Sequence, residues 1–190
     1  QINVYDPVSR ILFTGDIGLP MPGVHVRMLD DAGNDVPIGQ PGEIAIHGPQ
    51  VMAGYWRRPE DTAAAFTPDG YFLSGDIGVM DTQGRIRIID RKKDMVVVSG
   101  FKVYPAEIEA VLARHPGVLE STAVGMPDAA TGEAVKLVVV KKDPALTESE
   151  LLAYCAEQLT AYKCPRSVEF MDALPRSALG KVLRRELRTA

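Results

Sequence analysis

The sequence predicts an α+β fold in which a small β-rich, barrel-like subdomain precedes a compact α+β domain. Short strand patterns separated by glycine-containing turns fill residues 1–90, whereas residues 91–190 alternate strand patterns with amphipathic helix patterns. The composition changes at the same place. Residues 1–90 contain no lysine and carry 6 Arg against 12 Asp and Glu, whereas residues 91–190 carry 15 Lys and Arg against 13 acids. We therefore expect two domains, 1–90 and 91–190.

The overall composition excludes several classes of protein. A chain of 190 residues suits one large or two small domains, and a net charge of −4 argues against generic nucleic-acid binding. Neither a signal peptide nor a membrane-spanning apolar run is recognisable. Cys155 and Cys164 have no ligand-like neighbours, which indicates structural thiols in a reduced, cytoplasmic protein.

Residues 1–90 contain short strand patterns and a short helix pattern. Apolar and polar residues alternate in the strands, and Gly, Asp and Asn supply the turns. In the helix, Pro59 suits the first turn, and Glu60 and Asp61 suit the positive end of the helix dipole. His25 and His47 are expected to be ordinary strand residues. The predicted strands are 24–28, 43–47, 71–73, 77–80 and 85–90, and the predicted helix is 58–66.

The second part of the chain has longer elements. Apolar residues at helical spacing predict a helix at 105–115. A capping box, in which Thr147 precedes Glu150 by three positions and leucines flank the pair, predicts a second helix that runs to about residue 161. Strands are expected at 95–98, 121–124, 134–140 and 167–171, and a terminal helical turn at 183–187.

The segment 88–102 joins the two parts. Its charged run, residues 90–94, lies between two apolar strand patterns and is costly to bury, so we expect a surface joint. Arg91 could reach a ribose or a phosphate, and Lys93 could act as a hinge because an exposed polar residue changes conformation with little loss of packing. A solvated charge run is the alternative. The second apolar run stops at Ser99-Gly100.

Two further motifs carry residues suited to chemistry. In residues 69–78, Asp76 follows a glycine between short strands, where a carboxylate can accept two hydrogen bonds from a vicinal diol such as a ribose. In residues 175–187, Lys181 follows Gly180 on a loop and could serve as a mobile point charge for phosphate or carboxylate. The loop lacks the Walker pattern. Taken alone, a turn aspartate and a solvated surface lysine are the alternatives.

Together these motifs resemble the adenylate-forming enzymes, and most closely the bacterial long-chain fatty-acid–CoA ligases. Any one matching block of sequence is weak evidence for the family, but five blocks in the same order along nearly the whole chain are specific evidence. Two positions depart from the family pattern: Ser74 replaces the usual Thr but keeps the hydroxyl, and Asp16, in a near copy of the Asp76 motif, is assigned no role. The matching blocks are 42–66, 69–78, 87–109, 159–165 and 175–187.

The resemblance implies a reaction in two steps. A carboxylate attacks the α-phosphorus of ATP to give acyl-AMP and pyrophosphate, and the CoA thiol then displaces AMP after the C-terminal lid domain rotates. Asp76 and Arg91 would hold the ribose, Lys93 would be the hinge, and Lys181 would bridge the carboxylate and the phosphate. The residues implied at the CoA channel are Ser99, Gly100 and Lys102.

The resemblance also implies what surrounds the chain. Residues 1–90 would end a large N-terminal adenylation domain, residues 91–190 would be the mobile lid, and the chain, which starts at Gln1, would be the C-terminal portion of a longer enzyme. Fatty acid, ATP and CoA are the expected substrates, with the Mg²⁺ ligands in the missing N-terminal part and no metal ligands here. A cytoplasmic location is expected, and peripheral contact with the inner membrane and a homodimer stay open.

Two alternatives to this function remain. One is a ligase of the same superfamily for aryl or short-chain acids, because the tunnel that selects chain length lies mostly outside these residues. The other is a non-catalytic module that binds CoA or a partner protein.

Overall fold

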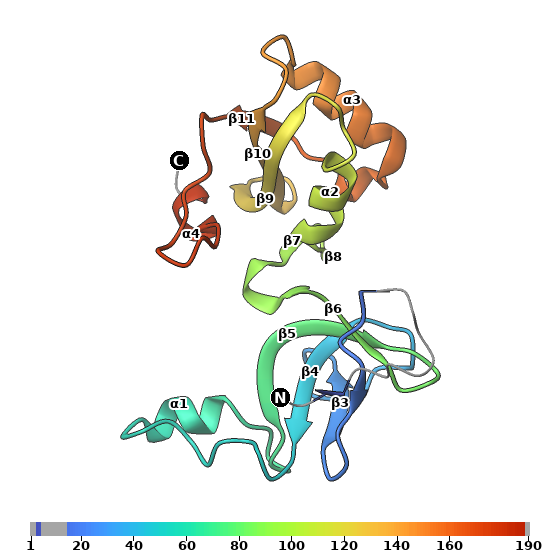
Figure 1. Cartoon of the computed structure of the whole chain (residues 1–190), viewed down its shortest axis with the longest axis vertical. Helices are drawn as coiled ribbons and strands as arrows, with labels where there is room; N and C mark the ends of the chain where they lie inside the picture. The colour runs from blue at the N-terminus through green and yellow to red at the C-terminus, as the bar shows by residue number, and fades with distance from the viewer. Residues whose placement is uncertain (1–2, 5–14, 189–190) are drawn as a thin grey trace. The chain divides into compact units, whose positions relative to one another are not determined.

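A computed structural model describes residues 3–4 and 15–188 of the chain (Figure 1). The chain forms two compact units, Gln1–Lys93 and Asp94–Ala190. Each unit combines helices with a mainly antiparallel sheet, so the predicted α+β class is confirmed. Among the described residues, no helix is long and apolar enough to cross a membrane.

The first unit is built on a curved four-stranded antiparallel meander, in the order β3-β4-β5-β6 (Figure 1). Its apolar residues gather in a small core of Val24, Met28, Ile44, Ile46 and Ile86. The elements are β1 (Asn3–Val4), β2 (Leu19–Pro20), β3 (His25–Leu29), β4 (Gly42–His47), α1 (Pro59–Ala64), β5 (Phe72–Met80) and β6 (Ile86–Arg91). His25 and His47 pair across β3 and β4, in line with their expected role as strand residues.

One strand of this sheet differs from the prediction. Residues 71–73 and 77–80 were expected to form two short strands, but β5 is a single strand with a bulge. Glu43 pairs with Ile77 and Ala45 with Leu73, so the three residues 74–76 lie opposite one residue of β4. The bulge is possible because Gly75 adopts a φ of +74°, which other residues rarely tolerate. A bulge re-aims the side chains that it carries, and this one carries Asp76.

The second unit is built around β10. Strand β9 pairs antiparallel along one edge of β10, whereas β11 (parallel) and β7 (antiparallel) pair with it at different positions. A two-residue turn joins β7 to β8, a strand that sequence patterning missed. The elements are η1 (Lys92–Asp94), β7 (Val96–Val98), β8 (Phe101–Val103), α2 (Pro105–Leu112), β9 (Val118–Asp128), β10 (Gly132–Lys141), α3 (Glu148–Gln158), η2 (Ala161–Lys163), β11 (Ser167–Phe170) and α4 (Arg184–Leu187).

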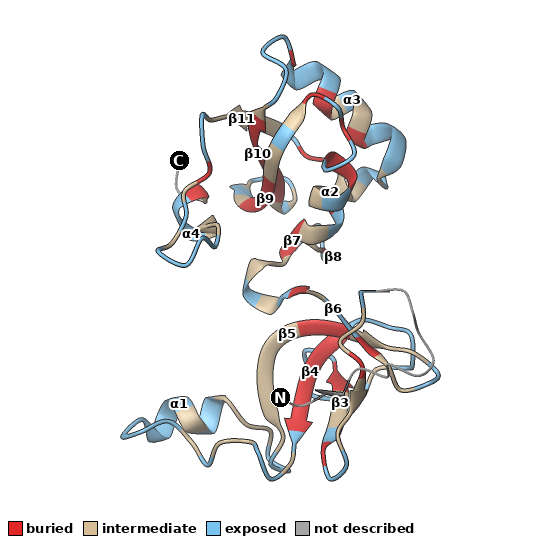
Figure 2. Cartoon of the chain, in the orientation of Figure 1, coloured by how far each residue is buried: buried red, intermediate tan, exposed pale blue. Residues whose placement is uncertain are grey.

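Buried residues occur along β9 and β10 of this second sheet (Figure 2). One core cluster joins the sheet to α2 and α3, and the other joins it to the C-terminal segment that contains α4. The capping box at the start of α3 is confirmed, because the backbone N–H of Glu150 donates to Thr147 Oγ1 at 3.3 Å. Both long helices are shorter than predicted: α2 ends at Leu112, and α3 ends at Gln158 because Leu159 is extended.

Both cysteines are free thiols with a place in the packing of the second unit. Cys155 lies on the buried face of α3, and this burial raises the pKa of its thiol to about 11. Cys164 is half-buried, and desolvation raises its pKa as well. Protonated, poorly accessible thiols are poor nucleophiles, which agrees with the structural role expected for them.

A matched pair of leucine substitutions tests the core of the second unit. Leu137 on β10 is fully buried, whereas Leu119 on β9 is 62% exposed. Leu137→Ala should lower the free energy of opening of β10 by about 2–5 kcal/mol, because it removes buried methyl groups and leaves a cavity. Native-state hydrogen exchange of the β10 amides measures this free energy of opening within the second unit. Fluorescence of Trp56 would not report on it, because Trp56 lies in the other unit. Leu119→Ala should change the value by less than about 0.5 kcal/mol, and equal effects would contradict the assignment.

Candidate active site

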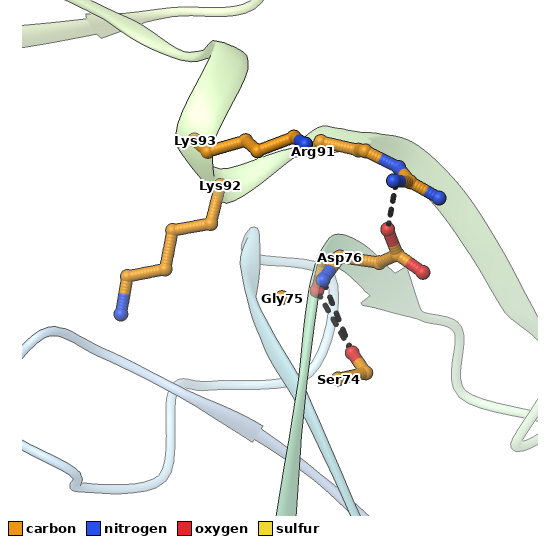
Figure 3. A pocket seen from close by; sticks show the side chains of 6 residues that line it. All are labelled: Ser74, Gly75, Asp76, Arg91, Lys92 and Lys93. Atoms are coloured by element: carbon orange, nitrogen blue, oxygen red, sulfur yellow. Dashed lines mark hydrogen bonds and ion pairs between the residues drawn. The ribbon is translucent and has the colours of Figure 1, made fainter. Parts of the chain in front are cut away.

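A polar pocket of about 420 Å³ lies in the first unit, where the β5 bulge meets the end of β6 (Figure 3). It brings together residues predicted from two motifs: Asp76 from residues 69–78, and Arg91 and Lys93 from the charged run 90–94. The pocket is lined by Ser74, Gly75, Asp76, Arg91, Lys92 and Lys93. All of these residues belong to the first unit, so the pocket is built by one folded body.

Asp76 and Arg91 form the centre of this pocket. They are direct cross-strand partners in the β5–β6 ladder, and Arg91 Nε lies 3.5 Å from Asp76 Oδ1. The backbone N–H of Asp76 donates to Ser74 Oγ at 3.1 Å, so the serine hydroxyl stabilises the bulge (Figure 3). The Asp76 side chain is 30% exposed and the Arg91 side chain 57% exposed, which leaves polar atoms of both residues open to a ligand.

Glu43 supports the pocket by binding two of its lining residues, Gly75 and Lys92. This residue was not predicted from the sequence. Its side chain is only 7% exposed. Glu43 Oε1 accepts the backbone N–H of Gly75 at 3.1 Å, and Glu43 Oε2 accepts from Lys92 Nζ at 2.7 Å. A buried carboxylate is stable only when it is paired and hydrogen-bonded, and both conditions are met here. The available signal was an acidic residue within the apolar strand pattern at Gly42–His47.

The charges of the pocket favour an anion that also carries hydroxyl groups. Three basic side chains, Arg91, Lys92 and Lys93, line it together with one carboxylate, Asp76. Cationic groups suit phosphate, whereas a carboxylate accepts hydrogen bonds from a diol, and a nucleotide offers both. Among residues 3–4 and 15–188, no group of three or more His, Cys, Asp or Glu side chains could hold a metal ion.

The predicted CoA-channel residues share one hairpin of the second unit. Val98 pairs with Phe101, so Ser99 and Gly100 form a two-residue turn, with φ values of +49° and +83°. Two positive φ values in such a turn are typical of a type I′ hairpin. A side chain added at Gly100 would meet nothing within 4 Å, and Lys102 is exposed on β8. The turn therefore presents backbone to open space.

A smaller cavity of about 260 Å³ lies beside this hairpin in the second unit. Ser99 and Tyr162 are among its lining residues, and the Tyr162 ring stacks on Phe101 with ring centroids 4.8 Å apart. Arg166 also lines the cavity and forms an ion pair of 2.6 Å with Asp128. The cavity thus combines an aromatic face with a cation.

Lys181 lies on a second loop of this unit, and the loop is closed by its own backbone. Arg176 and Val182 form an isolated antiparallel bridge, and the N–H of Ser177 donates to the carbonyl of Lys181 at 2.8 Å. Gly180 adopts a φ of +77° next to the lysine. Lys181 is exposed, so its ammonium group can reach a ligand outside the unit. The predicted site residues therefore lie in three places: the pocket of the first unit and two loops of the second.

Comparison with known protein families gives two matches. Residues 4–56 match the family model described as AMP-binding enzyme, and residues 107–181 match the model described as AMP-binding enzyme C-terminal domain. The two matched segments lie in different compact units.

Curated relatives match over nearly the whole chain. The chain is 57% identical over 188 residues to the long-chain-fatty-acid–CoA ligase of Escherichia coli O6:H1, covering 99% of this chain and 33% of that protein. It is 56% identical to the long-chain-fatty-acid–CoA ligase of Yersinia pestis, over 96% of this chain and 32% of the relative. A feruloyl-CoA synthase of an Amycolatopsis species is 44% identical over 92% of this chain and 35% of its own length. The chain spans about a third of the length of the curated relatives that it matches.

Solved structures agree with these relatives. ATP-bound MatB from Rhodopseudomonas palustris superimposes with a TM-score of 0.86 at 43% identity, over 92% of this chain and 35% of that one. O-succinylbenzoate coenzyme A synthetase (MenE) from Bacillus subtilis, in complex with ATP and magnesium ion, gives 0.85 at 34% identity over 98% and 38%. The family matches, the relatives and the shared fold together show that the chain belongs to the AMP-binding, or adenylate-forming, family of enzymes.

Proposed function

We propose that the chain is the C-terminal part of an enzyme that activates a long-chain fatty acid with ATP and transfers the acyl group to CoA. The observation that carries the proposal is the pocket in which Asp76 and Arg91 meet, in a chain 57% identical to long-chain-fatty-acid–CoA ligases. In this proposal the first unit ends the adenylation domain, and the second unit forms the mobile lid.

In the first half-reaction, the pocket of the first unit holds the nucleotide. Asp76 accepts hydrogen bonds from the two ribose hydroxyls, and Arg91 donates to the ribose or to a phosphate oxygen. The 3.5 Å Asp76–Arg91 contact is long for a charge-assisted bond, so a ribose hydroxyl can compete for the carboxylate. The buried Glu43 fixes Gly75 and Lys92, the residues next to Asp76 and Arg91 in the two strands.

Lys181 supplies positive charge as the fatty acid carboxylate attacks the α-phosphorus. Negative charge gathers on the phosphate oxygens in that transition state, and a lysine ammonium positioned there lowers the barrier. The lysine is exposed on a loop that is closed by its own backbone hydrogen bonds. An exposed side chain is required if the lysine is to contact a ligand bound outside this unit. Mg²⁺ would neutralise further charge, with its ligands supplied by residues outside this chain.

In the second half-reaction, a rotation at Lys93 brings the other loop of the lid to the acyl-AMP. Ser99 and Gly100 then border the path of the CoA thiol, and Lys102 offers a cation to the CoA phosphates. The open space at Gly100 supports this role, because a pantetheine arm needs close approach to backbone. The two half-reactions need different residues of the second unit at the same catalytic centre, one set after the other, which is the reason for a domain that rotates.

A ligase for aryl acids is the second candidate, favoured by the 44% identity to a feruloyl-CoA synthase. The higher identity to long-chain ligases places it second. A non-catalytic binding module is the third, and it predicts no role for Lys181.

The substrate assignment is tested with the full-length enzyme that contains this chain. With ATP and CoA, AMP release should depend on oleate and should be slower with ferulate or acetate. The 190-residue chain alone should release no AMP, because the chain covers only about a third of its relatives. Preference for ferulate would favour the aryl-acid alternative, and the absence of turnover with any acid would favour the binding module.

Lys181→Ala tests the division of labour between the two loops. In the full-length enzyme, the substitution should slow acyl-AMP formation by on the order of 100-fold or more, because it removes the charge that faces the transition state. Thioester formation from supplied acyl-AMP and CoA should stay within about twofold of wild type. Pyrophosphate release and acyl-CoA formation, measured separately, would contradict the proposal if both fell equally.

Asp76→Asn tests the ribose contact while preserving the size of the side chain. The KM for ATP should rise by about 10–100-fold, because a hydrogen bond to a charged group contributes about 1.5–3 kcal/mol. Glu60→Gln is the matched control, since Glu60 is an exposed acid on α1, away from the pocket lining. It should leave the KM unchanged. Equal KM values for ATP in all three enzymes would remove Asp76 from the nucleotide site.

A further inference from the structure

We infer that Arg184 is a positioning residue that holds the Lys181 loop in place, through a cluster of acidic residues at the start of the second unit. The inference rests on the proposed role of Lys181 in acyl-AMP formation. Arg184 lies three positions after Lys181, at the beginning of α4.

The Arg184 guanidinium contacts three separate elements. Nη2 donates to both carboxylate oxygens of Glu109 on α2, each at 2.8 Å. Nε donates to Thr122 Oγ1 on β9 at 3.2 Å, and Nη1 lies 3.3 Å from Asp94 Oδ2. The planar fork of arginine can make such contacts at once, whereas lysine, a single point charge, cannot.

The cluster is partly buried and balanced in charge. The side chains of Arg184, Glu109 and Asp94 are only 15–22% exposed. Arg188 Nη2 adds a contact of 3.5 Å to Asp94, so two arginines face two carboxylates. Glu109 is held from the other side as well, because its Oε1 accepts from Thr122 Oγ1 at 2.8 Å. Removing the Arg184 guanidinium would take the bidentate partner from Glu109, whereas Asp94 would keep Arg188.

The cluster fixes the base of the loop that carries Lys181. The N–H of Leu183, next to Arg184, donates to the carbonyl of Pro175 at 2.8 Å and closes the loop at its base. Leu187 at the end of α4 is buried in the same core cluster as Leu174. Apolar packing thus anchors the segments on both sides of the loop, and the guanidinium sets the direction in which the loop leaves the sheet.

A second arginine braces the loop near its tip but in a more exposed setting. Arg176 Nη1 donates to the carbonyl of Gly180, and Arg176 Nη2 donates to Glu120 Oε1, each at 2.8 Å. The side chains of Arg176 and Glu120 are more than 40% exposed, and exposed ion pairs contribute little. Arg184 is therefore the stronger of the two constraints.

The Asp94 contact gives the cluster a further part in the lid movement. Asp94 is the first residue of the second unit and follows Lys93, the proposed hinge. Through one guanidinium, the first residue after the hinge is tied to the lysine loop, 90 positions further along the chain. A rotation that begins at Lys93 would then move the loop that carries Lys181 together with the rest of the second unit. A misplacement of about 1 Å at a reacting centre can cost on the order of 100-fold in rate.

The experiment compares Arg184→Met with Arg185→Ala in the full-length enzyme. Arg185 lies on the same helical turn, is exposed, and has no ion pair among the described residues, so it is a matched control. Arg184→Met should slow acyl-AMP formation by about 10–100-fold and leave thioester formation from supplied acyl-AMP within about twofold of wild type. The rate of acyl-AMP formation in Arg184→Lys should fall between those of wild type and Arg184→Met, because lysine keeps the positive charge but not the planar guanidinium. Arg185→Ala should behave as wild type.

Hydrogen exchange separates positioning from a general loss of structure. In Arg184→Met, the amides of residues 176–183 should exchange faster, while those of β9 and β10 keep their wild-type rates. Unchanged exchange in 176–183 would overturn the inference, as would a parallel loss of both half-reactions with faster exchange throughout the second unit. Because exchange needs no turnover, it tests the inference even if the wild-type enzyme activates no fatty acid, an outcome that would overturn only the proposed function.

Discussion

The buried carboxylate of Glu43 is the constraint on which the first unit's pocket depends. It accepts from the backbone of Gly75 on one side and from the ammonium of Lys92 on the other, at 3.1 and 2.7 Å. A carboxylate this deeply buried must keep both partners, so the bulge in β5 and the charged run after β6 are held in register with each other. The Asp76–Arg91 pair comes directly next to these two fixed points, since Gly75 precedes Asp76 and Lys92 follows Arg91. The geometry of the pocket is thus set by a residue that need not touch any ligand.

The charged run after β6 is divided between the two units in the same way. Lys92 binds Glu43 within the first unit, and Asp94 binds Arg184 within the second. Lys93 is the single residue between these two anchors in the sequence. A run of charges that resembles a solvated linker therefore forms structural ion pairs, those of Lys92 within the first folded body and those of Asp94 within the second. This division puts the proposed hinge at the boundary between the two folded bodies.

Local signals predicted most of the fold, and distant contacts explain what they missed. The Thr147 cap of α3 was predictable because both partners lie within one turn. The β5 strand was divided wrongly because Gly75 interrupts an apolar pattern that the sheet in fact continues through a bulge. Glu43 and Arg184 were missed because their partners lie 32 to 90 positions away, and a single sequence gives no sign of such pairs. The motifs placed Asp76 and Arg91 in one pocket, whereas their roles toward a nucleotide remain predictions.

The length of the chain that separates the partners of Arg184 has a consequence for biosynthesis. Thr122, Glu109 and Asp94 precede Arg184 by 62, 75 and 90 positions, so a ribosome completes the sheet and both long helices before it adds the residue that joins them. Long-range contacts of this kind form late, because they must close a large loop. The loop that carries Lys181 is then the last part of the second unit to be ordered. A nascent or truncated chain would therefore have a folded sheet before it had an ordered loop around Lys181.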